Sequence, residues 1–305
     1  MEIRPGTDND ISAIVELLRI SLGETLMPKS EAFWRWKHID NPFGKSPVLL
    51  AFEKEQLVGV RAFMRWEWRQ GDTIYKAVRA VDTATHPDHL GKGIFKTLSL
   101  QLADQCKKEE VHFIFNTPNA QSKPGYLKMG WQELGKLRVA VRPVLNFSKH
   151  HPEFNQRYAW DQHTIDTLHS ASPTTVSDTT FTTLRSPLFF QWRYGVNPNI
   201  RYFKAGKADD GFIIVFRLKP YRFGTEFRIV DWFLSGHYSP GRLRELLFRA
   251  MYESGANVIT YSGGTLPFRS ITVNIGPTIT FRSLNYPKSL TFDLWKPTLG
   301  DMEVF

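Results

Sequence analysis

The stretch that decides the fold is HPDHLGKGIFKTL, residues 86–98. It follows a run of strand-forming residues and leads into a segment whose apolar residues recur at helical spacing. Gly91 and Gly93 lie at the junction, with Lys92 between them. Glycine lets backbone N–H groups turn toward one point, and the helix dipole adds positive potential there. The stretch therefore predicts a strand, a loop able to hold an anionic group, and a helix.

The glycine pattern fits neither of two common nucleotide loops. A dinucleotide-binding loop needs a longer glycine pattern and an acidic residue on the next strand, and a Walker loop needs Ser or Thr after Gly-Lys. Here Lys92 is followed by Gly93. The residues alone leave two interpretations open, a phosphate cradle and an ordinary helix cap.

A second motif, NAQSKPGYLKMGW at residues 119–131, follows the expected helix and the strand after it. Together the two motifs resemble the GNAT acetyltransferase superfamily over about residues 1–144. That family has a histidine-proline turn, a glycine loop for the coenzyme A pyrophosphate, and later Asn-x-x-Ala/Ser-x-x-x-Tyr-x-Lys-x-Gly-Phe/Trp. The chain departs from the family at Asp88 and Leu90, where basic or amide side chains are frequent.

The resemblance implies acetyl-CoA as the cosubstrate, with the pyrophosphate on the loop amides and the pantetheine along the preceding strand end and the second motif. The cofactor-binding residues that it implies are Thr83, Ala84, Thr85, Leu90, Gly91, Lys92, Gly93, Ile94, Asn119 and Ser122.

Three residues are candidates for proton transfer. The resemblance implies Tyr126 as the general acid that protonates the leaving thiolate, and the alternative for Tyr126 is a packed helix aromatic. Asp82 and Glu67 are candidate general bases on strands that flank the expected cleft, and each could instead be a solvated residue or an ion-pair partner. A water relay is the further alternative.

An internal repeat predicts a second domain. FWRWKHIDNP at residues 33–42 reappears as FFQWRYGVNP at 189–198, with Trp36 and Trp192 spaced by 156 positions. AVDTAT, residues 80–85, has a rough counterpart in IVDWFL, residues 229–234. Such a long period indicates duplication. The aromatic clusters could stack on a sugar or a nucleobase, but their repetition favours packing of each helix against its sheet.

We therefore expect an α/β (α+β) protein of two GNAT-like domains, each with a mixed, mostly antiparallel central sheet flanked by helices. Residues 1–147 form the acetyl-CoA-binding domain and residues 148–305 a second, degenerate domain. In the second copy Pro240 and Gly241 replace the Gly-x-Gly loop, and no counterpart of the second motif follows Tyr261. This copy is expected to keep the fold without a coenzyme site.

Composition narrows the function classes. The net charge of +9 is spread along the chain without a basic run, which argues against a nucleic-acid tail. The single cysteine, Cys106, excludes an internal disulfide, and no signal peptide or membrane-spanning run is apparent. We expect a cytoplasmic protein with no nucleic-acid or membrane partner. His86 and His89 lack a third ligand nearby, so no metal is expected.

The leading hypothesis is an N-acetyltransferase that moves an acetyl group from acetyl-CoA to a primary amine of a small molecule, possibly an amino sugar. One alternative is acyl or aminoacyl transfer to a cell-wall precursor. Another is a non-catalytic coenzyme A-binding or interaction protein.

Overall fold

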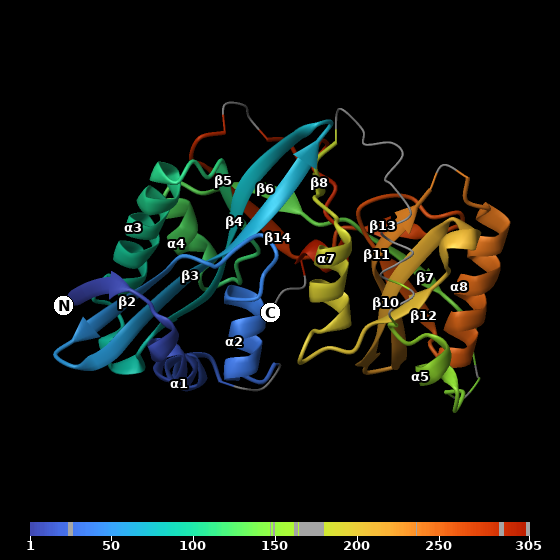
Figure 1. Cartoon of the computed structure of the whole chain (residues 1–305), viewed down its shortest axis with the longest axis horizontal. Helices are drawn as coiled ribbons and strands as arrows, with labels where there is room; N and C mark the ends of the chain where they lie inside the picture. Colours follow the sequence, from blue (N-terminus) through green and yellow to red (C-terminus); the bar gives the residue numbers. More distant parts are fainter. Residues whose placement is uncertain are drawn as a thin grey trace.

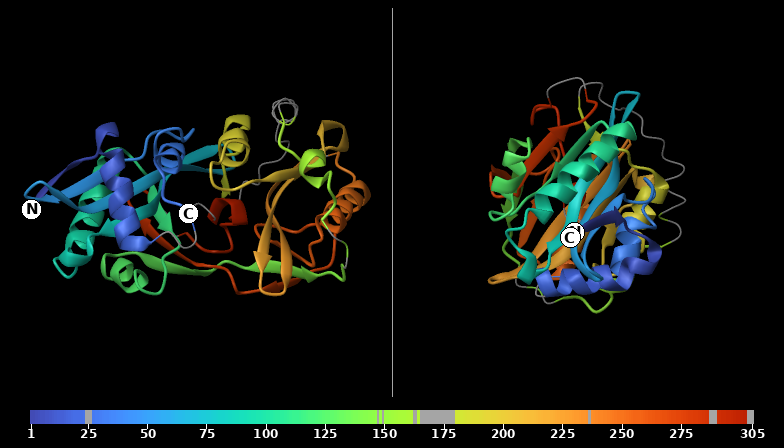
Figure 2. Two further views of the ribbon diagram at one scale, coloured as in Figure 1. Left: turned by 90° about the horizontal axis from the view of Figure 1, so that it is seen from below. Right: turned by 90° about the vertical axis from the view of Figure 1, so that its left-hand side faces the viewer.

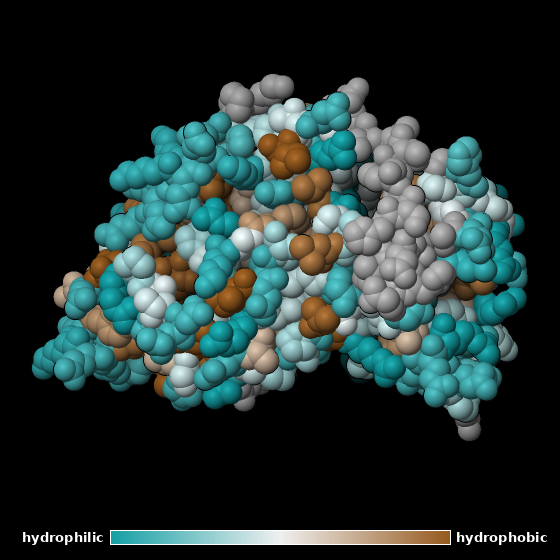
Figure 3. All heavy atoms as spheres, in the orientation of Figure 1, coloured by the Kyte–Doolittle hydropathy of each residue, from teal (hydrophilic) through white to brown (hydrophobic). Residues whose placement is uncertain are grey.

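The computed structural model describes residues 1–23, 27–146, 148, 150–161, 164, 180–235, 237–286 and 290–302. The molecule has two lobes side by side, each built on a twisted sheet with helices packed against it (Figure 1). Hydrophilic residues cover most of the face seen in Figure 3, and the outline is hollowed at the lower edge where the lobes meet.

The first lobe holds most of the N-terminal elements. They are β1 (Glu2–Pro5), η1 (Asp8–Asp10), α1 (Ile11–Leu22), α2 (Glu31–His38), β2 (Val48–Glu53), β3 (Gln56–Gln70), β4 (Thr73–Thr85), η2 (Pro87–His89), α3 (Ile94–Lys108), β5 (Phe113–Asn116), α4 (Lys123–Lys128) and β6 (Gln132–Lys136). The strand–loop–helix unit expected at residues 86–98 is thus the junction of β4 and α3.

The remaining elements begin with β7 (Val139–Pro143) and α5 (Phe154–Arg157). They continue with β8 (Thr182–Thr183), α7 (Pro187–Phe190), the π-helix η3 (Gln191–Gly195), β9 (Phe203–Ala205), η4 (Ala208–Asp210), β10 (Phe212–Tyr221), β11 (Gly224–Leu234), α8 (Pro240–Ser254), β12 (Val258–Tyr261), β13 (Ile271–Val273), β14 (Thr278–Ser283) and α9 (Leu299–Met302). No helix in the described parts of the chain has the length and apolar character that crossing a membrane requires.

The two sheets have similar strand orders. The first runs β1-β2-β3-β4-β5-β14-β6, with β8 beside β3, and the second runs β13-β7-β12-β11-β10-β9. In the first sheet β4 and β5 are parallel, in the second β11 and β12 are parallel, and the other pairs are antiparallel. The expected fold class, two mixed and mostly antiparallel sheets flanked by helices, is confirmed.

Each sheet contains strands from both sides of residue 147. β14 lies between β5 and β6 in the first sheet, and β7 lies between β12 and β13 in the second. Figure 2 shows the green and red segments that cross between the lobes. The division at residue 147 stays a prediction, and residue 147 itself lies outside the described residues. The first sheet depends on β14, which follows every strand of the second sheet in the sequence.

The first sheet is covered on both faces. On one face α1 buries the stripe formed by Ile11, Ile14, Leu17 and Leu18, as its apolar spacing predicts. On the other face α3 buries Leu98, Leu102 and Cys106. Burial raises the pKa of the Cys106 thiol to about 12, so this side chain acts as a small apolar group.

The repeated aromatic motifs meet at the centre of the molecule, where α2 and η3 come together. The indole N–H of Trp36 donates to the carbonyl of Trp192 at 2.8 Å, and the indole N–H of Trp192 donates to the carbonyl of Trp36 at 2.7 Å. The two rings stack with centroids 4.9 Å apart. The preference for packing over ligand stacking is thereby supported, because both indoles are buried and bonded to each other's helix.

We predict that Trp36→Phe and Trp192→Phe each destabilise the protein by about 1–3 kcal/mol more than Trp68→Phe, since each leaves a buried carbonyl without its donor. Trp68 is the matched control, because its indole N–H is buried without a partner among the described residues. Urea unfolding of the three variants provides the comparison. The double variant should cost less than the two single costs added, because the residues share one interaction. Equal costs for all three variants would contradict the assigned role of the pair.

Candidate functional site

The candidate site begins where β4 separates from β5. β4 pairs with β3 as far as Thr85, but it pairs with β5 only at Ala77, Val78 and Arg79. Beyond Arg79, the edge of β4 that faces β5 has no strand partner among the described residues. The residues expected to contact pantetheine, Thr83 to Thr85, lie on this part of β4. A backbone edge without a partner strand can offer hydrogen-bonding groups to an extended ligand, although the Thr85 carbonyl already accepts from the Ser21 hydroxyl at 3.1 Å.

The glycine loop follows directly. Gly91 and Gly93 have φ angles of 77° and 76°, and Gly93 immediately precedes α3. A Cβ added at either position would meet no atom within 4 Å. Space is therefore available above the loop, and the left-handed backbone is what requires glycine here. The first amides of α3 have no partner within the helix, which is the usual property of a helix N-terminus.

The backbone amides expected to bind phosphate are not all equally available. The amide of Leu90 already donates to the carbonyl of Pro87, although at a long 3.4 Å, and the Leu90 side chain is exposed. Because the Leu90 amide already has an acceptor, it is a poorer donor to a phosphate than the amides of Gly91 to Ile94. The residues present therefore fit a phosphate group at the start of α3.

The charge at the rim of the loop is partly neutralised. Lys92 Nζ lies 3.0 Å from Glu53 Oε2, and His89 Nδ1 lies 2.7 Å from the same oxygen. The hydrogen bond from Lys92 holds the pKa of the Glu53 carboxyl below its usual value.

Tyr126 lies close to both features. It comes from α4, is 3% exposed, and packs edge-on against Phe95 in the first turn of α3 at 5.3 Å. The guanidinium of Arg61 lies 5.3 Å from the centre of the Tyr126 ring, and Arg61 is paired with Thr83 across β3 and β4. The structure thus brings the tyrosine, the end of β4 and the start of α3 together.

Asn119 and Ser122 shape the turn that leads into α4. Asn119 Oδ1 accepts hydrogen bonds from the amides of Gln121 and Ser122 at 3.1 and 2.8 Å and from the Ser122 hydroxyl at 2.9 Å. These bonds fix the start of α4 and so the position of Tyr126. Contact of either residue with pantetheine stays a prediction.

Asp82 lies at a bulge in β4, where the register with β3 shifts, and it has a φ of 42°. Its carboxylate is hydrogen-bonded to Lys37 and lies 2.8 Å from His38 Nε2. These partners hold the pKa of Asp82 far below its usual value despite burial. A carboxylate that is so strongly paired is a poor proton acceptor, so the geometry favours a structural role over that of general base.

The second lobe contains a counterpart of this arrangement. Asp231 accepts two hydrogen bonds from Arg185 Nε, both at 2.9 Å, and one from the Tyr194 hydroxyl at 3.1 Å. Tyr194 occupies the place of His38 in the repeated motif. A buried aspartate thus ties the aromatic helix to the sheet in both lobes. Because the second lobe lacks the glycine loop, this pairing is better explained by stability than by catalysis.

Glu67 is distant from these groups. It is paired with Lys76, which lies seven positions before Thr83 on β4. At 3.3 Å per residue this separation is about 23 Å. Burial raises the pKa of Glu67, but the structure does not bring this carboxyl to the tyrosine or the loop.

Sequence reasoning missed Arg61, Lys37 and His38. A signal was present for each: Arg61 interrupts an apolar strand run, and Lys37 and His38 follow Trp36 at positions that a helix packed on both sides must bury. All three side chains are buried.

The corresponding region of the second lobe is closed. β11 pairs with β12 only from Glu226 to Arg228, but the C-terminal segment enters the space beyond. A Cβ on Gly300 would meet the Val230 carbonyl oxygen at 2.8 Å, and one on Gly263 would meet the Pro297 carbonyl oxygen at 3.0 Å.

The helix that follows also lacks the glycine loop. α8 is capped by the Ser239 hydroxyl, and Pro240 in its first turn has no N–H to donate.

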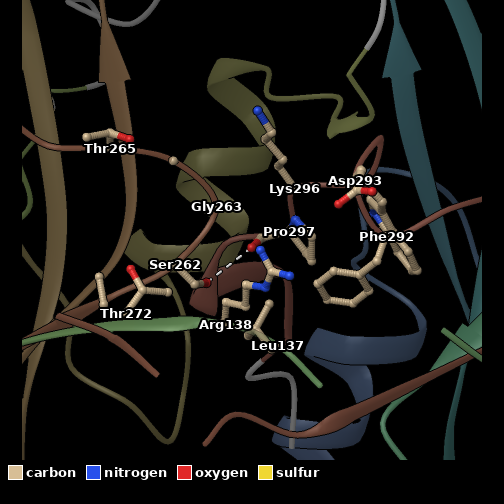
Figure 4. A pocket seen from close by; sticks show the side chains of 13 residues that line it. Leu137, Arg138, Ser262, Gly263, Thr265, Thr272, Phe292, Asp293, Lys296 and Pro297 are labelled. Carbon is tan, nitrogen blue, oxygen red and sulfur yellow. Dashed lines mark hydrogen bonds between the residues drawn. The ribbon is translucent and has the colours of Figure 1, made fainter. Parts of the chain in front are cut away.

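A separate pocket lies beside this closed region (Figure 4). Arg138 and Lys296 contribute cationic side chains to it, and Ser262 donates to the Pro297 carbonyl at 3.1 Å in its wall. Both cations are exposed. The pocket is distinct from the glycine loop and Tyr126.

One family model matches most of the first lobe. The family model described as acetyltransferase (GNAT) domain matches residues 2–134. No curated protein matches the chain.

Solved structures share the fold over nearly the whole chain. One is a GCN5-related N-acetyltransferase from Anabaena variabilis ATCC 29413, with 15% identity and a TM-score of 0.65, covering 93% of this chain and 73% of that one. A probable N-acyltransferase from Enterococcus faecalis V583 has 10% identity, a TM-score of 0.64 and the same coverages. A GCN5-related N-acetyltransferase from Kribbella flavida has 11% identity and a TM-score of 0.61, covering 94% and 72%.

We predict that Asp82→Asn lowers the free energy of unfolding by about 3–5 kcal/mol at pH 7, because it leaves Lys37 buried without its counter-charge. The folded-state pKa of Asp82 is depressed, so its contribution is complete above the unfolded-state pKa of about 3.9 and is lost as the pH falls further.

Urea unfolding at pH 7 and near pH 3 measures this difference, which should shrink at the lower pH. The control is Asp72→Asn, at an exposed carboxylate, and it should change stability little. A stable Asp82→Asn protein that has lost only its activity would restore Asp82 as the general base.

Proposed function

We propose that the chain transfers an acetyl group from acetyl-CoA to a primary amine of a small molecule, because residues 2–134 match the acetyltransferase (GNAT) domain model. The observation that carries the proposal is the convergence of three features. The unpaired end of β4, the open glycine loop and Tyr126 meet in one region of the first lobe.

Acetyl-CoA would supply the acetyl group as a thioester, with its pyrophosphate on the amides of Gly91 to Ile94. Lys92 is within reach of the same loop as a mobile positive charge. The free backbone edge near Thr83 would hold the pantetheine and donate to the thioester carbonyl oxygen, which gains negative charge during the reaction.

The transfer makes one bond and breaks another. The amine nitrogen attacks the carbonyl carbon, a C–N bond forms, and the C–S bond breaks with its electron pair remaining on sulfur. Tyr126 donates its hydroxyl proton to that sulfur as general acid. The amine loses its proton to solvent through a water relay, since Asp82 is ion-paired and Glu67 is remote.

The second lobe is inferred to be a duplicated copy that has lost its coenzyme site. Its support is the reciprocal pair of Trp36 and Trp192 and the matching aspartates, Asp82 and Asp231. We infer that this lobe limits the shape of the acceptor that reaches the first. The proposed acceptor, a small amine such as an amino sugar, is inferred from the resemblance to the acetyltransferase family.

The free thiol of Cys106 is buried, which is consistent with the reducing, cytoplasmic compartment expected from composition.

We predict that Gly91→Glu and Gly93→Glu abolish acetyl-CoA binding, because each places a negative side chain in the open space where the pyrophosphate is expected. Titration calorimetry measures the affinity. The matched control is Gly255→Glu, since Gly255 ends α8 with φ 72° and ψ 10° and Gly93 has φ 76° and ψ 7°. This control carries the same backbone strain and should bind normally. Undiminished binding in both loop variants would exclude the loop as the phosphate site.

We predict that Tyr126→Phe lowers turnover by roughly 10²- to 10⁴-fold, the range for loss of a general acid. The affinity for acetyl-CoA should change little, because the interaction is made in the transition state. Thiol release with a panel of primary amines measures turnover. Tyr286→Phe, a hydroxyl deletion at another buried tyrosine, serves as the control. Near-normal turnover of the Tyr126 variant, with chemistry rate-limiting, would leave Tyr126 as a packing residue.

A further inference from the structure

Arg61 is a buried charge that has no hydrogen-bond partner in the described parts of the chain. Its side chain extends from the middle of β3 and is 0% exposed. The nitrogens Nε, Nη1 and Nη2 all lack a partner among the described residues. Burying a charge without a counter-charge or hydrogen bonds is strongly unfavourable. The fold therefore retains at this position a group that weakens it.

Other buried arginines of the molecule are bonded. Arg79 donates to the carbonyls of Asp301 and Met302 at 2.7 and 2.6 Å. Arg193 donates to the Gly300 carbonyl at 2.9 Å and to the Tyr202 hydroxyl at 3.0 Å. These two side chains hold the C-terminal segment in place. Arg61 has no comparable structural task.

The surroundings of Arg61 are aromatic. Its guanidinium lies 4.8 Å from the ring centre of Phe63, 5.7 Å from that of Phe95 and 5.3 Å from that of Tyr126. The negative face of an aromatic ring attracts a cation, but less than a carboxylate does. A full negative charge that forms close by would be a much stronger partner in such an apolar site.

The proposed function supplies such a charge. When Tyr126 gives its proton to the departing sulfur, the O–H bond breaks, an S–H bond forms, and the phenolate keeps the electron pair. The phenolate regains a proton from solvent before the next turnover. A fixed positive charge beside the ring stabilises this phenolate without any rearrangement during the reaction.

We propose that Arg61 is a positioning residue for acyl transfer. Its buried guanidinium packs 5.3 Å from the ring centre of Tyr126, orients that ring, and stabilises the negative charge that Tyr126 acquires as general acid. The inference rests on the proposed function, because it needs Tyr126 to release a proton. It predicts that Arg61 lowers the stability of the folded protein and raises the rate of acyl transfer.

The test compares Arg61→Met with the wild type, since methionine is unbranched and removes the charge with little loss of buried volume. The melting temperature of the unliganded protein should stay the same or rise, because an uncompensated charge has been removed. Turnover should fall by roughly 10- to 100-fold, a typical loss for one electrostatic contact to developing charge. The KM for acetyl-CoA should change by less than about threefold, as expected for an effect confined to the transition state.

Two further variants separate a catalytic effect from a structural one. Arg61→Lys keeps the positive charge and should recover most of the turnover. In the Tyr126→Phe background, Arg61→Met should have little further effect, since the two residues act as one unit. Arg193→Met is the control for removal of a bonded buried arginine, and it should lower the melting temperature.

The outcomes are distinguishable. A large drop in the melting temperature of Arg61→Met would make Arg61 a structural residue and overturn the inference. So would normal turnover in that variant, a loss expressed in KM alone, or an undiminished effect in the Tyr126→Phe background. If the wild-type protein transfers no acetyl group to any amine of the panel, the proposed function fails, and the role of Arg61 fails with it.

Discussion

The insertion of β14 between β5 and β6 of the first sheet is the constraint on which the rest of the structure depends. β14 completes the first sheet beside β5, and β7 completes the second beside β12. The first sheet cannot close until β14 (Thr278–Ser283) has reached its place between β5 and β6. The stacked pair of Trp36 and Trp192 joins the lobes on a second surface. The gap beyond Arg79, which forms the candidate site, is therefore held by parts of the chain far apart in sequence.

The gap between the two parallel strands is open in the first lobe and filled in the second. In each sheet the parallel pair among the described strands, β4 with β5 and β11 with β12, separates after three paired residues. In the first lobe a glycine loop and Tyr126 border the gap. In the second, the segment before and within α9 occupies it, and glycines at 263 and 300 permit the close approach. Arg79 on β4 donates hydrogen bonds to this segment. The C-terminal part of the chain therefore fills the gap in the second lobe and also contacts the strand that borders the gap in the first.

Much of the fold and part of the site were predictable from the sequence. The helical spacing of apolar residues predicted α1 and α3, and the repeat that contains Trp36 and Trp192 predicted the corresponding helices α2 and η3. These patterns could be found because they are local in the sequence. The insertion of β14 was not predictable, since a strand pattern does not specify its partner. Asp82 lies on a strand as expected, but its ion pair with Lys37 forms between elements that are distant in the sequence. Arg61 carried only a weak signal, one charge in an apolar run, and its lack of partners becomes visible only in three dimensions.

Hydrogen–deuterium exchange of the whole chain, with and without excess acetyl-CoA, tests the central claim most directly. The claim is that the first lobe alone holds an acyl-CoA site. Acetyl-CoA should slow amide exchange at the end of β4, in the loop at Gly91 to Gly93 and around Tyr126, because these backbone groups would then be covered. Exchange at the start of α8 should not change. Protection at the start of α8, or none at the glycine loop, would contradict this account.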